Sequence, residues 1–164
     1  MNSFPSIAGT ITAVHSLAGE GGAQSLCSFL LELQTSQGAA SLVLTPNTYV
    51  HENESLKSGD RITAFYDPNA PVPLIYPPRY TALVIAETEK GSQAVLDVFD
   101  HTLTSSDGTL RLTPDSDTDI LTPNGQKIRQ IPGGNLLLVI FSATTRSIPA
   151  LTVPEDIVVF CREA

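Results

Sequence analysis

The chain has 164 residues and a formal net charge of −8, with 17 acidic side chains against nine Lys and Arg. This balance excludes functions that need clustered basic side chains, such as nonspecific binding to nucleic acid phosphates or to an anionic membrane. The length suits one domain or two small ones, and two halves of this size would each bury only a marginal core alone. We therefore expect two halves that pack closely together.

Short runs rich in Val, Ile, Leu, Thr and Tyr, separated by 12 prolines and 11 glycines, predict an all-β protein. In the first half, Gly59-Asp60 precedes one strand, and residues 46–56 interrupt the strand pattern. The strands expected in this half are residues 7–14, 25–35, 39–44, 61–66 and 80–86.

The second half follows a similar order. Asn124-Gly125 is a strong signal for a hairpin turn. The continuously apolar run 136–141 predicts a strand that is buried on both faces. The strands expected in this half are residues 94–99, 109–112, 118–121, 127–131, 136–141 and 157–161.

The two halves repeat the same motif order. Leu42-Val43-Leu44-Thr45-Pro46-Asn47 recurs as Leu110-Arg111-Leu112-Thr113-Pro114-Asp115, and Gly59-Asp60 before an apolar run recurs as Gly134-Asn135. A repeat of this length predicts an internal duplication. The strand order resembles an OB-fold, a five-stranded barrel that binds ligands across its second and third strands. We expect two tandem OB-like small barrels, residues 1–88 and 89–164, with the strand near residues 80–88 as a candidate shared element.

Two segments carry a more local resemblance. They are Pro71-Val72-Pro73-Leu74-Ile75-Tyr76-Pro77-Pro78 and Thr144-Thr145-Arg146-Ser147-Ile148-Pro149-Ala150. Both resemble segments of an uncharacterised β-rich protein family of Gram-positive, clostridia-like bacteria. Some of its members are secreted and carry a further domain that resembles the N-terminal part of copper amine oxidases. The resemblance implies a β-rich fold and carries no function.

The proline-rich loop, residues 67–80, is the main candidate for a ligand site. Prolines fix φ and lower the entropy that a loop loses on binding, and Tyr and Arg are enriched at binding hot spots. The tentative ligand-binding residues are Tyr76, Arg79 and Tyr80, with Arg146 in the counterpart loop 142–154.

Two structural alternatives stand beside this ligand site. The loop can be a rigid crossover in which Leu74, Ile75 and Tyr76 cover an open barrel end. The two arginines can form ion pairs with Asp67, Glu155 or Asp156.

The alternation Asp115, Asp117, Asp119 is a weak indication of calcium, because a hard cation needs several oxygen ligands. The positions where an EF-hand needs Gly and Glu hold Ile120 and Gln126, and alternating charges are also ordinary on an edge strand. The three histidines lie far apart, and no nucleophile or phosphate-loop motif is present. We therefore expect no metal, no cofactor and no catalytic residue.

These features favour a non-catalytic binding module that recognises a protein segment or a small polar ligand through its proline-rich loops. The first alternative is a structural unit that forms homo-oligomers through exposed β edges. The second is an enzyme whose site is assembled between the two halves. Binding to nucleic acid is not expected, because a basic groove beside exposed aromatic residues is missing from the pattern.

Cys27 and Cys161 each lie in an apolar, strand-like run, which predicts buried free thiols. No stretch approaches the ~20 apolar residues of a membrane span. The first residues lack the basic and apolar regions of a signal peptide. We expect a cytoplasmic protein, or a secreted one if a leader has been removed.

Overall fold

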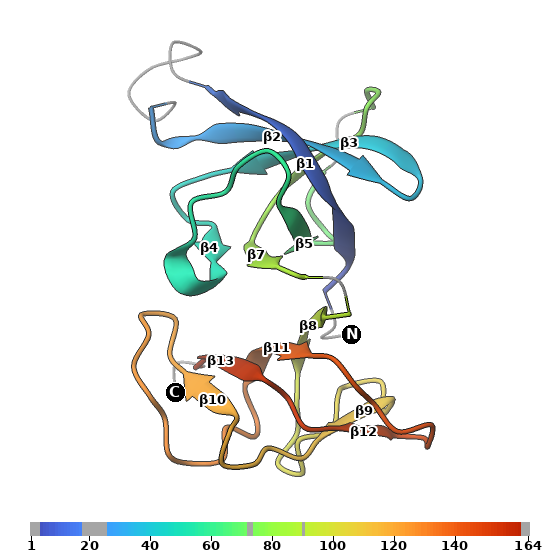
Figure 1. The fold of residues 1–164 in the computed structure, drawn as a ribbon, viewed down its shortest axis with the longest axis vertical. Coiled ribbons are helices and arrows are strands. Elements are labelled where there is room, and N and C mark those ends of the chain that lie inside the picture. Colours follow the sequence, from blue (N-terminus) through green and yellow to red (C-terminus); the bar gives the residue numbers. More distant parts are fainter. Residues whose placement is uncertain (1–3, 18–25, 72–73, 90, 162–164) are drawn as a thin grey trace. The chain divides into compact units, whose positions relative to one another are not determined.

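The computed structural model describes residues 4–17, 26–71, 74–89 and 91–161, and it is all-β as expected. The chain divides into two compact units (Figure 1). The first unit is Pro5–Glu89, and the second unit comprises the described residues of Met1–Phe4 and Lys90–Ala164. Within the described ranges, no helix combines the length and apolar character that crossing a membrane requires.

The first unit is a single seven-stranded sheet with the order β4-β7-β5-β1-β2-β3-β6. The long strand β1 pairs antiparallel with both β2 and β5, whereas β6 runs parallel to β3 and β4 runs parallel to β7. The bounds are β1 Ser6–Ser16, β2 Phe29–Thr35, β3 Gly38–Leu44, β4 Tyr49–Val50, β5 Arg61–Phe65, β6 Arg79–Thr81 and β7 Val84–Glu87, with a short 3-10 helix at His51–Asn53 between β4 and β5.

The strand expected at residues 80–86 is broken in two where it changes partners. The Ala82 N–H donates to the Val43 carbonyl oxygen at 3.0 Å, and the Leu83 N–H donates to the Phe65 carbonyl oxygen at 2.8 Å. The chain thus leaves β3 as β6 and joins β5 as β7. The sheet is not closed into a barrel, because β4 and β6 remain as its edges.

The core of the first unit follows the alternation of side chains along its strands. Ile11, Leu31, Leu42, Ile62 and Ile85 are almost completely buried in one cluster, because successive strand residues point to opposite faces. A Cβ atom on Gly9 would lie 2.7 Å from the Gln34 carbonyl oxygen. Glycine is therefore needed in β1, where that strand passes close to the backbone of β2.

The second unit contains a four-stranded sheet, β10-β13-β11-β8, and a separate parallel pair, β12-β9. The strand β11 is buried along almost its whole length, as its apolar run predicts. Residues 127–131 were expected to form a strand, but Lys127 makes only an isolated bridge to Leu121. The bounds are β8 Gln93–Val98, β9 Leu110–Leu112, β10 Asp119–Leu121, β11 Leu136–Phe141, β12 Ala150–Thr152 and β13 Asp156–Phe160.

The two units repeat one order of strand pairing. The strands β8, β9, β10, β11, β12 and β13 have the same partners and directions as β1, β3, β4, β5, β6 and β7. Between β8 and β9, where the first unit has β2, the described residues of the second unit form only the isolated bridges Phe99–Ser105 and Thr104–Arg111. The segment expected as a shared strand forms β6 and β7, whose strand partners are β3, β4 and β5 of the first unit. In the second unit, β8 takes the pairing position that β1 has in the first unit.

Thr48 and Thr118 make the same pair of hydrogen bonds in the two units. Thr48 Oγ1 accepts from the Thr45 N–H and donates to the Ala82 carbonyl oxygen at 2.7 Å. Thr118 Oγ1 likewise accepts from the Asp115 N–H and donates to the Pro154 carbonyl oxygen, also at 2.7 Å. Thr45 thus corresponds to Asp115, two residues away from the Thr113 that sequence similarity selects.

Both cysteines are free, as expected, but both are exposed, which corrects the expectation that they are buried. Cys27 precedes the first residue of β2, and Cys161 follows the last residue of β13. Each cysteine thus lies outside the residues that are paired in a strand, and its thiol lies outside the core.

Candidate functional site

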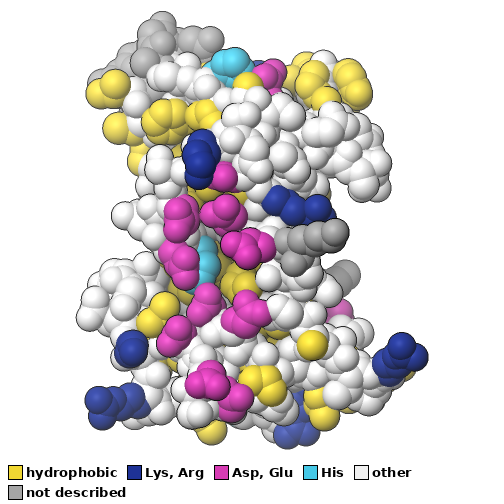
Figure 2. Space-filling model, in the orientation of Figure 1, with side chains coloured by type: hydrophobic (Ala, Val, Ile, Leu, Met, Phe, Trp, Pro, Cys, Tyr) yellow, Lys and Arg dark blue, Asp and Glu magenta, His cyan; other side chains and the backbone are white. Residues whose placement is uncertain are grey.

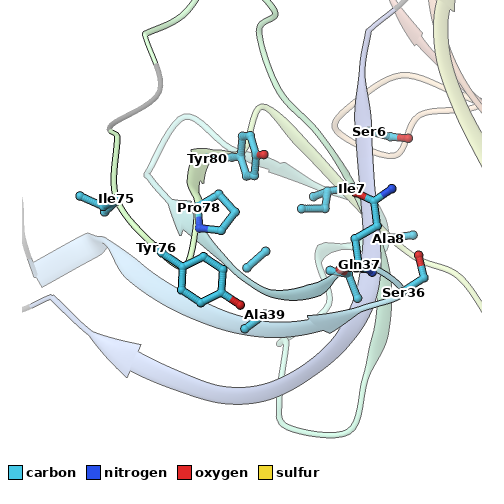
Figure 3. A pocket seen from close by; sticks show the side chains of 12 residues that line it. Ser6, Ile7, Ala8, Ser36, Gln37, Ala39, Ile75, Tyr76, Pro78 and Tyr80 are labelled. Atoms are coloured by element: carbon cyan, nitrogen blue, oxygen red, sulfur yellow. Dashed lines mark hydrogen bonds between the residues drawn. The ribbon is translucent and has the colours of Figure 1, made fainter.

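A groove of about 600 Å³ lies in the first unit between the start of β1, the β2–β3 hairpin and the end of the proline-rich loop (Figure 3). We call it the hairpin groove. Tyr76, Pro78 and Tyr80 stand on one side of it, and the β1 residues stand on the other. Its lining consists of residues 6–8, 35–37, 39, 40, 75, 76, 78 and 80.

The groove is open because its hairpin has a tight turn and small side chains. Thr35 Oγ1 donates to the Gly38 carbonyl oxygen at 2.7 Å and accepts from the Gln37 N–H at 3.1 Å, which orders the turn. Gly38 has φ +112°, a conformation that glycine adopts without steric cost. Ala39 and Ala40 follow at the start of β3, and their methyl groups leave the space above them empty.

Tyr76 forms a wall of the groove and is 83% exposed. Its hydroxyl oxygen lies 3.7 Å from the position that a Cβ atom on Gly38 would take, so the ring reaches from the loop toward the hairpin tip. Leu74 and Ile75 beside it are also exposed. These three side chains therefore do not cover a barrel end, and the crossover alternative is wrong in that respect.

Tyr80 is half-buried and packs against the core of the first unit. Its ring centroid lies 4.6 Å from that of Tyr66, at an interplanar angle of 32°. Burial raises the pKa of the Tyr66 hydroxyl, and the neighbouring Tyr80 raises that pKa further. This packing makes Tyr80 a fixed side chain at the back of the hairpin groove.

Arg79 lies beside a second, smaller cavity of about 150 Å³ that is lined also by Asp67 and Tyr66. Arg146 is exposed in the loop between β11 and β12 of the second unit. Within the described part of the chain neither arginine forms an ion pair, so the structural pairing with Asp67, Glu155 or Asp156 is not formed.

The predicted ligand residues are thus separated. The structure brings Tyr76 and Tyr80 to one groove, whereas Arg79 lines the smaller cavity beside Tyr80. Arg146 belongs to the second unit, and its neighbour Thr145 orders that loop through hydrogen bonds to Ser147 and Leu151.

The weak metal candidates do not form a common set of ligands. Asp115 uses Oδ1 to accept the Asp117 N–H at 2.8 Å, which fixes a local turn. Asp119 lies in β10 and pairs with Asp156 of β13. Among the described residues, the three carboxylates of Asp115, Asp117 and Asp119 do not gather closely enough to share an ion.

Four polar residues of the hairpin groove were missed by the sequence prediction, namely Ser6, Thr35, Ser36 and Gln37. The Ser36-Gln37-Gly38 turn is readable from the sequence, but its position opposite residues 75–80 is not. That position depends on the parallel pairing of β3 with β6, a contact between segments that are distant along the chain.

No family model matches the sequence, and no curated protein is found to match it either. The distribution of Lys and Arg side chains over the surface bears on binding to phosphate groups. On the face that Figure 2 shows, the Lys and Arg side chains are scattered and form no basic patch, in keeping with the acidic composition.

Proposed function

We propose that the chain is a non-catalytic binding module and that the hairpin groove of the first unit holds an uncharged polar ligand. One observation carries this proposal: a groove of ligand size is lined by exposed aromatic and hydrogen-bonding side chains and by no Lys, Arg, His, Asp or Glu. Its volume lies within the roughly 300–1,000 Å³ of small-molecule sites. General acid–base chemistry would need a positioned titratable group, and the two phenols are the only candidates at the groove.

We also propose that the two units are diverged copies of one OB-like barrel. The common pairing order and the equivalent threonines Thr48 and Thr118 support this origin. OB-type barrels are partly open and use their second and third strands for ligands. In the second unit that hairpin is reduced to isolated bridges, so the binding role falls to the first unit. Proteins that share the Pro71–Pro78 segment would then share this groove.

Amide-resolved NMR tests the binding proposal directly. The ¹⁵N-labelled protein is titrated with a set of small, neutral polar compounds, including amides, polyols and blocked dipeptides. We expect chemical-shift changes to concentrate on residues 6–8, 35–40 and 75–80, and we expect Tyr76→Ala to abolish them because the ring forms one wall of the groove.

Leu74→Ala is the matched control. Leu74 is fully exposed in the same loop and does not line the groove, so its removal should leave the shifts unchanged. Shift changes spread over both units, or changes that survive Tyr76→Ala, would contradict the proposal.

A further inference from the structure

We infer that the ligand of the hairpin groove is a neutral saccharide, bound with one sugar ring against Tyr76. This inference rests on the proposed function and narrows it to one class of ligand. It is carried by three properties of the lining: its lack of charge, its unused hydrogen-bonding side chains and its uncovered aromatic ring.

The absence of charge selects against ionic ligands. No acidic, basic or imidazole side chain lines the groove. A carboxylate, phosphate or ammonium group entering it would lose hydration without gaining a counter-charge, which is costly. The net charge of −8 adds a long-range repulsion for anions.

The polar side chains of the lining have hydrogen-bonding capacity to offer. Within the described residues, the side chains of Ser6, Ser36, Gln37 and Tyr76 make no hydrogen bond. A hydroxyl or a carboxamide can both donate and accept, and the hydroxyl groups of a sugar need partners of this kind. Ser36 and Gln37 lie at the hairpin turn, and Tyr76 lies on the wall opposite β1. These three side chains can therefore reach one ligand from two sides.

The ring of Tyr76 provides the apolar part of the recognition. The ring extends from the proline-rich loop toward Gly38, and most of its surface is exposed to solvent. A pyranose ring has a face of C–H groups and an edge of hydroxyl groups. An aromatic face beside amide and hydroxyl side chains matches both parts, because tyrosine joins an apolar ring to a polar tip.

A peptide is the competing class of ligand, and the backbone beside the groove does not exclude it. The strand β6 is an edge of the sheet, and β1 pairs with β2 only from Gly9 onward. An extended peptide gains its affinity by joining a strand edge of this kind. A peptide probe is therefore included in the test below.

Calorimetry and amide-resolved NMR with defined neutral oligosaccharides test the inference. The probes are cellohexaose, xylohexaose, maltohexaose and fully N-acetylated chitohexaose, with an oligogalacturonate as the anionic comparison. We expect at least one neutral probe to bind at the groove, and Tyr76→Ala and Gln37→Ala each to weaken it about tenfold or more. Leu74→Ala should leave its affinity unchanged, and the oligogalacturonate should not bind.

Ionic strength gives a second readout. The affinity for the neutral probe should stay the same when salt is raised about tenfold, because neither partner brings a charge to the contact. A strong salt dependence would overturn the inference, as would tighter binding of the anionic probe.

The outcomes separate this inference from the proposed function. If an uncharged, blocked proline-rich peptide shifts the groove resonances in a Tyr76-dependent way and no saccharide does, the saccharide inference is wrong and the groove remains the site. If no compound of either kind shifts those resonances, both are overturned.

Discussion

At the scale of single residues, Asp97 is a buried carboxylate of the second unit that accepts several hydrogen bonds. It is 2% exposed, and its carboxylate accepts the Ser106 N–H at 3.0 Å, the Ser106 hydroxyl at 2.8 Å and the Val98 N–H at 2.7 Å. These bonds tie the end of β8 to the turn that contains Ser106, so the carboxylate holds two segments of the second unit together.

We predict that Asp97→Ala lowers the free energy of unfolding by about 1–3 kcal/mol or more, because buried donors lose their acceptor. Asp97→Asn should lose less, since one acceptor oxygen remains. Urea unfolding measured by circular dichroism provides the values. Asp117→Ala, at an exposed turn position, is the control and should change stability by no more than about 0.5 kcal/mol. Equal effects for Asp97→Ala and Asp117→Ala would show that the Asp97 bonds add nothing.

The site residues differ in how readable they are from the sequence. Tyr76 could be selected because prolines surround it, and that property is local. Gln37 carries no local signal beyond its place in a turn. Its role depends on the fold bringing the hairpin opposite the loop, so a single sequence could not identify it. Arg79 and Arg146 were selected together because they occupy corresponding loops of the two halves, and one of them lies in each unit.

At the scale of elements, strands with several apolar residues, in alternation or in a continuous run, could be predicted, among them β1, β5, β8 and β13. The two elements that the sequence did not reveal, β4 and β12, are only two and three residues long. Each exists through parallel pairing with a distant strand, β7 or β9, and has no pattern of its own. The reverse error was a strand expected at residues 127–131. The turn signal is real, but pairing with the short strand β10 is limited to the Lys127 bridge and the Ile128 hydrogen bond to Ile120.

The crossing of β1 and β2 at Gly9 supplies a test at this scale. We predict that Gly9→Ala destabilises the protein by about 1–3 kcal/mol, since the added methyl would press on the Gln34 carbonyl and the strands would have to separate. Thermal unfolding gives the comparison with Thr10→Ala, an exposed neighbour on the same strand that should stay within about 0.5 kcal/mol of the parent. If Gly9→Ala leaves the free energy of unfolding unchanged, β1 can shift without loss of its pairing, and the prediction is wrong.

At the scale of the whole molecule, the two units should respond to acid in opposite directions. In the first unit, burial raises the pKa of Glu87 above its ordinary 4.5, and the nearby Asp60 and Glu54 raise it further. An acid whose pKa is raised by folding opposes folding when ionised, so the first unit should gain stability as pH falls through that pKa.

In the second unit, hydrogen bonds lower the pKa values of Asp100 and Asp107 below the ordinary 3.8. The largest contribution comes from the Thr102 side chain for Asp100 and from the Thr109 side chain for Asp107. The stabilisation from both carboxylates is present above 3.8 and is lost as pH falls through their lowered pKa values.

We predict that NMR signals of the two units, followed in urea at a series of pH values, diverge as the solution is acidified. The first unit should resist urea better near the pKa of Glu87 than at neutral pH, and Glu87→Gln should remove this gain. The second unit should weaken below pH 3.8, and Asp107→Asn should reduce that loss. Parallel titration of both units would contradict this assignment of the pH dependence.

The small side chains beneath the hairpin groove have a consequence for how this surface can change over generations. Ala8 and Ala39 are exposed and hold no part of the core together, while Ala40 alone is buried. Substitutions at the first two positions can reshape the cleft one methylene at a time without loss of folding. Selection can therefore retune what the groove admits while the rest of the sheet stays as it is.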